Sequence, residues 1–185
     1  MTIFDNILIS LALGVTVMMT VRSCCSQAQI KLSKGLMMSG VIALFHALFV
    51  VLGWWIGSVF QFGFEEYDRL FFLGFLVFVA VKIFVNDHKK GKELPAYDIG
   101  RLGTVCLLAV ATGVNTFLVG IGLGFNASDG YNWLKLGLPM FLLVLLMAYW
   151  GVMLGRQKVE LRSRRWVLVA ILLIFVVALR GTFWC

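Results

Sequence analysis

The sequence predicts an all-α membrane protein with six transmembrane helices arranged as two inverted three-helix repeats. Its composition, six long apolar runs and an internal repeat lead to this prediction. Of the 185 residues, 61% are hydrophobic and 14% are charged, with a mean hydropathy of +0.96. A soluble domain carries about 25% charged residues, so this chain has too little polar surface for a water-soluble globule. The same composition excludes a disordered chain and a disulfide-rich secreted scaffold.

Each apolar run is close to the length of about 20 residues that a helix needs to cross the hydrocarbon core. The runs cover residues 7–21, 36–60, 70–85, 102–125, 134–155 and 166–183. The first and third are short, so we expect their helices to extend a few residues into the flanking sequence. The longest connection covers residues 86–101, which leaves no room for a soluble domain. We therefore expect a single integral membrane domain over residues 1–185.

Lys and Arg are distributed unevenly between the two sides of the predicted spans. Twelve lie in the segments after the first, third and fifth spans, against three on the other side, namely Arg69, Lys135 and Arg180. Cytoplasmic loops are enriched in Lys and Arg, so we place the basic segments in the cytoplasm and both termini outside, in a bacterial inner membrane. Lys82 and Arg180 lie at span ends, where we expect their charged groups to snorkel to the interface.

Three pairs of segments match in the same order at offsets of 97 to 98 residues. They are residues 11–13 with 108–110, Gly53 and Gly57 with Gly151 and Gly155, and residues 80–82 with 178–180. In this register Met18 falls opposite Asn115. Repeat 1 then covers about residues 1–88 and repeat 2 about residues 100–185.

Each repeat holds three spans, an odd number, so the second repeat runs through the membrane inverted relative to the first. Inverted repeats favour a transporter with its site near the midplane, although channels and some membrane enzymes also use duplicated halves. The four glycines of the second match have the small-xxx-small spacing that lets helix backbones pack closely.

The midplane of the predicted spans is almost free of ionisable side chains. None of the nine acidic residues lies well inside a span, and His46 is the ionisable residue nearest the middle of one. Polar and thioether side chains at similar depth complete a candidate substrate-binding site, namely Asn115, Met18, Thr16, Thr112 and Thr116. Imidazole suits several transition metals and thioether suits Cu(I), so His46 and Asn115 are candidate metal ligands. The alternative is that His46 hydrogen-bonds an Asn or Thr on a neighbouring helix.

No catalytic motif is present, so we predict that the chain is not an enzyme and holds no cofactor apart from a transported ion. We expect contact with the lipid bilayer and a small ion or solute as substrate, with no nucleic acid. A homodimer or a partner membrane protein remains a further option.

Several strings resemble the bacterial manganese efflux pumps, within the LysE-type exporter superfamily. They cover residues 11–14, 52–57, 111–115 and 119–123, in matching order. The resemblance implies export of Mn²⁺ or a related divalent cation, held by intramembrane carboxylates. It also implies that the family's acidic residues fall on Met18, His46 and Asn115, so all three acids are replaced here.

A divalent cation leaves water only where the protein supplies negative charge, and these replacements supply none. We therefore predict that this chain does not handle Mn²⁺ as its relatives do. One hypothesis is an efflux transporter whose altered site takes a divalent or soft metal cation, or another small solute. The alternative is a transport-inactive accessory or interaction protein on the same scaffold.

Overall fold

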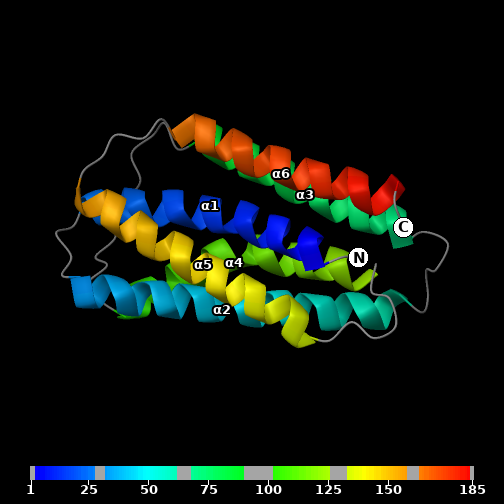
Figure 1. Cartoon of the computed structure of the whole chain (residues 1–185), viewed down its shortest axis with the longest axis horizontal. Coiled ribbons are helices and arrows are strands. Elements are labelled where there is room, and N and C mark those ends of the chain that lie inside the picture. Colours follow the sequence, from blue (N-terminus) through cyan, green and yellow to red (C-terminus); the bar gives the residue numbers. More distant parts are fainter. Residues whose placement is uncertain are drawn as a thin grey trace.

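The computed structural model describes residues 3–27, 32–61, 68–89, 102–125, 133–157 and 163–183. These ranges form six α-helices and contain no strand, which confirms the all-helical prediction. In chain order they are α1 (Ile3–Gln27), α2 (Leu32–Gln61), α3 (Asp68–Lys89), α4 (Leu102–Phe125), α5 (Trp133–Arg156) and α6 (Ser163–Phe183) (Figure 1).

Four of the helices are long and apolar enough to cross a membrane. Their apolar stretches are Phe4–Ser26, Ser33–Phe60, Leu102–Phe125 and Trp133–Arg156, and α3 holds a shorter one, Leu70–Val85. An α-helix satisfies its backbone hydrogen bonds internally, which the hydrocarbon region requires. As expected, α1 and α3 extend beyond their predicted apolar runs, because each helix continues through polar residues at its ends.

The helices pack in an ordered set of pairs. Helix α1 packs against α5 and α6, α4 packs against α2 and α3, α2 packs against α5, and α3 packs against α6. Figure 1 shows α3 and α6 side by side along one edge of the group formed by the other four helices. Direct contact between α1 and α4 is slight.

Close glycine contacts show that α2 and α4 run parallel. A Cβ atom added at Gly53 would meet the carbonyl oxygen of Phe117, and one added at Gly57 would meet that of Ile121. From the first contact to the second, α2 and α4 each advance by four residues, about one helical turn, in the same direction. Because no side chain intervenes, the two backbones come into direct contact, as small-residue pairs allow in membranes.

Helices α1 and α5 make the same kind of parallel contact. A Cβ atom at Gly151 would lie 2.6 Å from the carbonyl oxygen of Met18, and one at Gly155 would lie 2.8 Å from that of Arg22. All four glycines that the sequence singled out for packing therefore lie at helix–helix contacts.

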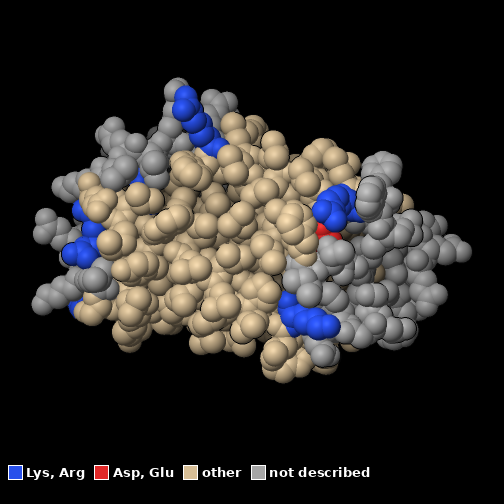
Figure 2. Space-filling view, in the orientation of Figure 1, with Lys and Arg blue, Asp and Glu red and all other residues tan. Residues whose placement is uncertain are grey.

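All six helices contribute buried apolar side chains to one core cluster. Its largest fully buried members are Phe72, Ile9, Leu13, Ile42, Leu76 and Met140. Large apolar side chains also cover the outside of the bundle, including Trp55, Leu146 and Trp150 at 61% exposure each. Figure 2 shows uncharged surface across the middle of one face and Lys and Arg toward its two ends. An apolar outer belt of this kind suits contact with lipid.

Candidate functional site

His46 of α2 is 1% exposed and forms hydrogen bonds with two threonines of α4. Its Nδ1 atom lies 2.6 Å from the Oγ1 atom of Thr116, and its Nε2 atom lies 3.2 Å from the Oγ1 atom of Thr112. The threonines are four residues apart and therefore lie on the same face of α4. The structure thus brings together three of the predicted site residues.

The hydroxyl hydrogens determine which ring nitrogen carries the proton. The Thr112 hydroxyl donates to the Leu108 carbonyl oxygen at 2.9 Å, so its oxygen accepts from His46. This assigns the proton to Nε2 and leaves Nδ1 to accept from the Thr116 hydroxyl. The imidazole is neutral in this arrangement, and both of its nitrogens are occupied.

The hydrogen bond with Thr116 uses the imidazole lone pair that a metal ion would need. Ligation through Nδ1 would require the Thr116 hydroxyl to move away, and Nε2 already carries a hydrogen. The structure shows His46 in hydrogen bonds with two residues of a neighbouring helix, the arrangement that the sequence allowed as the alternative to metal binding.

Asn115 lies next to Thr116 on α4 and is half-buried. Its Oδ1 atom is buried and has no hydrogen-bond partner among the residues that the structure describes. A buried amide oxygen without a partner costs free energy, whereas a ligand would satisfy it. Asn115 is thus a predicted site residue with a buried acceptor atom open for a ligand.

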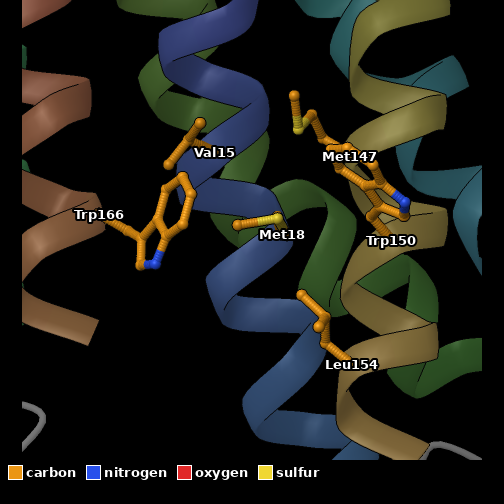
Figure 3. A pocket seen from close by; sticks show the side chains of 6 residues that line it. All are labelled: Val15, Met18, Met147, Trp150, Leu154 and Trp166. Carbon is orange, nitrogen blue, oxygen red and sulfur yellow. The ribbon is translucent and has the colours of Figure 1, made fainter. Parts of the chain in front are cut away.

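Met18 lies on α1 and lines a cavity of about 250 Å³ with residues of α5 and α6. The cavity residues are Val15, Met18, Met147, Trp150, Leu154 and Trp166 (Figure 3). This lining is apolar and presents two thioether sulfurs, from Met18 and Met147, but neither His46 nor Asn115 belongs to it.

Thr16, the remaining predicted residue, uses its hydroxyl within its own helix. The Thr16 Oγ1 atom donates to the Leu13 carbonyl oxygen at 2.7 Å. Such back-bonding satisfies the hydroxyl hydrogen and leaves an oxygen lone pair as an acceptor. The predicted residues therefore fall into one group on α2 and α4 and another on α1.

Sequence reasoning did not predict a polar cluster where α1 begins and α6 ends. Asp5, Asn6 and Ser10 are at most 6% exposed, and the Oδ1 atom of Asp5 lies 3.5 Å from the Nε atom of Arg180. Arg180 was expected only to snorkel, but its guanidinium also lies 5.4 Å from the ring centre of Phe4. The sequence feature that could have predicted this cluster is the presence of three polar residues within six positions of an apolar helix.

The described residues hold no group of three or more His, Cys, Asp or Glu side chains that could bind a metal ion. The structure therefore contains no conventional transition-metal site in these ranges. Any cation at the midplane would depend on amide, hydroxyl and thioether ligands.

Comparison with known proteins identifies the family. The chain matches the family described as "Putative manganese efflux pump" over residues 29–180. The chain belongs to this family. It is a multi-pass membrane protein of a transporter family for manganese efflux, as the resemblance implied. The prediction that it is not an enzyme agrees with this family.

Three relatives are each named "Putative manganese efflux pump MntP". The protein from Phocaeicola vulgatus is 25% identical over 134 residues, which is 70% of each chain. The protein from Campylobacter curvus is 30% identical over 116 residues, or 62% of each chain. The protein from Methanospirillum hungatei is 33% identical over 85 residues, or 44% of each chain. No solved structure matches this chain.

Proposed function

We propose that this chain is an inner-membrane efflux transporter of the manganese-exporter type whose midplane site is electrically neutral. Both termini lie outside the cell in this proposal, as the distribution of Lys and Arg favours. Membership of the family supports efflux as the activity. The neutral site is what distinguishes this chain from the carboxylate site that its family resemblance implied.

The proposal includes six spans arranged as two inverted repeats. Exchanging α1, α2 and α3 with α4, α5 and α6 converts the α2–α4 pair into the α1–α5 pair, and both pairs are parallel and close on glycines. The same exchange converts α3–α4 into α1–α6. This correspondence supports a pseudo-two-fold axis in the membrane plane, with the substrate between the repeats.

The observation that carries the proposal is the buried Oδ1 atom of Asn115, which has no hydrogen-bond partner in the described part of the chain. It lies where the resemblance places an acidic residue of the family, and it offers a substrate a neutral oxygen. His46 acts through the threonines, because its bonds to Thr112 and Thr116 fix the face of α4 next to Asn115. Met18 and Thr16 offer a thioether and a hydroxyl oxygen on α1, in a group separate from the one that His46 forms with the α4 residues.

Neutral ligands determine which substrates the site favours. A hard divalent cation needs negative charge to replace its hydration shell, so Mn²⁺ is disfavoured at this midplane. A soft cation, which thioether ligands suit, or a small neutral or zwitterionic solute fits better. The transported ion or solute is the substrate, and no resident cofactor is part of the proposal.

The test is a panel of metal sensitivity and accumulation in a deletion strain. The strain is complemented with the wild-type chain, with His46→Ala, with Asn115→Leu or with the control Met140→Leu. We expect wild type and control to lower accumulation of at least one substrate, and Asn115→Leu to abolish this effect. If no metal or solute changes growth or accumulation, efflux is contradicted.

A second candidate function is supported by the burial of His46. An imidazole that is 1% exposed and hydrogen-bonded to a neighbouring helix is also expected in a scaffold that does not transport. In that case the chain is an accessory or interaction protein of the membrane, with a second copy or another membrane protein as partner. Wild type and Asn115→Leu would then behave identically throughout the panel.

A further inference from the structure

The apolar cavity beside Met18 is a groove between α5 and α6 with α1 as its floor. Helix α1 packs against both α5 and α6, whereas direct contact between α5 and α6 is at most slight in the described ranges. Figure 3 shows side chains of α6 on one side, of α5 on the other and of α1 between them, namely Trp166, then Met147, Trp150 and Leu154, then Val15 and Met18. Neither His46 nor Asn115 lines this groove, so it is separate from the pair on α2 and α4.

The groove opens toward the outside of the bundle. Trp150 and Trp166, on its two sides, are 61% and 41% exposed, and outside a bundle of membrane spans lies lipid. On α5 the lining extends over seven residues from Leu154 to Met147, which is about 10 Å along the helix. Ordered water needs several polar partners, and this lining is apolar. The cavity of about 250 Å³ therefore suits an apolar chain rather than water.

Two arginines flank the groove at the end of the bundle where α5 ends and α6 begins. Arg22 follows Met18 by four residues, so it lies on the same face of α1, one turn further along. Its carbonyl oxygen is close to Gly155, which places it beside the last turn of α5. Arg165 is exposed and immediately precedes Trp166 on α6. Both arginines are therefore within about one helical turn of a residue that lines the groove.

The charge at this end of the groove suits a phosphate. Arg22 also takes part in an interaction within the protein. A guanidinium has five N–H donors, so it can bind a phosphate oxygen and keep that interaction. Arg156 lies at the same end of the bundle, but it is about 200° around α5 from Leu154 and therefore faces away from the groove.

We propose that this groove binds an anionic phospholipid, with an acyl chain between α5 and α6 and the phosphate at Arg22 and Arg165. Basic pockets between membrane helices recognise anionic headgroups in this way. A transmembrane helix of a partner protein spans about 30 Å, which is too long for a groove of this length. The site goes beyond the proposed function, because lipid binding requires no transport.

The charge is tested by native mass spectrometry of the purified full chain in detergent. We expect wild type to bind phosphatidylglycerol more tightly than phosphatidylcholine with the same acyl chains. Arg22→Gln and Arg165→Gln should each weaken the binding of phosphatidylglycerol by about fivefold, the contribution of one arginine near a membrane surface. The matched control is Arg156→Gln, which removes the same charge at the same end of the bundle and should leave the binding of both lipids unchanged.

The groove itself is tested by filling it. Leu154→Trp places a large side chain in the groove, whereas Leu138→Trp makes the same change at an exposed position near the other end of α5. We expect Leu154→Trp to lower the affinity for phosphatidylglycerol and Leu138→Trp to leave it unchanged. Inorganic phosphate at the lipid concentration should not displace the bound lipid, because the acyl chain also contacts the protein.

Four results would overturn the proposal. They are equal binding of the two lipids by wild type, an Arg165→Gln variant that behaves like Arg156→Gln, a Leu154→Trp variant that behaves like Leu138→Trp, and displacement of the lipid by inorganic phosphate. Arg165 is exposed, so its variant tests the charge even where Arg22→Gln disturbs folding. Binding in detergent is independent of flux, so absence of efflux would contradict the proposed function and leave this result standing.

Discussion

The Nδ1 atom of His46 accepts a hydrogen bond of 2.6 Å from the hydroxyl of Thr116, which fixes α2 to α4 within the apolar bundle. The other ring nitrogen lies 3.2 Å from the Thr112 hydroxyl oxygen, so both nitrogens of the imidazole have hydrogen-bond partners. His46 therefore positions α4, and the neighbouring Asn115 keeps an open acceptor.

The bond between His46 and Thr116 predicts a measurable coupling. In a double-mutant cycle with His46→Leu and Thr116→Val, we expect a coupling free energy of about 0.6 kcal/mol and at most about 1.7 kcal/mol, the average and the maximum found for hydrogen bonds between membrane helices. The free energy of unfolding in detergent provides the measurement. The control pair is His46→Leu with Ser39→Ala, because the Ser39 hydroxyl donates to the Gly35 carbonyl oxygen of the same helix. The effects of these two substitutions on the free energy of unfolding should add. Additivity in both cycles would contradict the account.

Gly57 predicts a steric effect at the contact between α2 and α4. Its Cβ position coincides with the backbone at Ile121 and Gly124, so Gly57→Ala should destabilise the protein by about 1–3 kcal/mol. At Gly74 of α3 nothing lies within 4 Å of the added atom, so Gly74→Ala should be neutral or slightly stabilising. Thermal unfolding of both variants distinguishes close packing from the general effect of an added methyl group.

We expect the same steric effect at Gly151, where α5 contacts α1. Its added Cβ would lie 2.6 Å from the carbonyl oxygen of Met18, so Gly151→Ala should cost about as much as Gly57→Ala. Gly40 of α2, with nothing within 4 Å, provides the control as Gly40→Ala. A cost confined to Gly57 would count against equivalent roles for the two helix pairs.

We expect a substitution at Asn115 to affect stability and efflux in opposite ways. Replacing a buried amide that lacks a partner removes an unmet hydrogen-bonding need, so Asn115→Leu should leave the free energy of unfolding unchanged or raise it by about 1 kcal/mol. The same variant should lose efflux, because an open acceptor used by the substrate is gone. Thermal unfolding and an accumulation assay on one preparation test both parts. Lower stability with unchanged efflux would make Asn115 a structural residue.

The helices could be predicted from the sequence because apolar length alone determines where a span can lie. The glycine spacing predicted close packing, but the partner of each pair required the helix arrangement. Depth placed His46 near Thr112 and Thr116, yet the choice between ligand and hydrogen bond depends on the rotation of α2 and α4, which apolar sequence does not specify. Asp5 and Arg180 were treated separately because nothing in the sequence pairs the start of α1 with the end of α6.

The central claim is that the midplane is neutral and does not hold Mn²⁺. Mn²⁺ flux in proteoliposomes tests it most directly, with the wild-type chain compared with His46→Leu, Asn115→Leu and the double variant Met18→Asp/Asn115→Asp. The account predicts that Mn²⁺ flux through the wild type stays at the level of protein-free liposomes and that the double variant exceeds it, because the two aspartates return negative charge to the site. Mn²⁺ flux through the wild type that disappears in both His46→Leu and Asn115→Leu would contradict it.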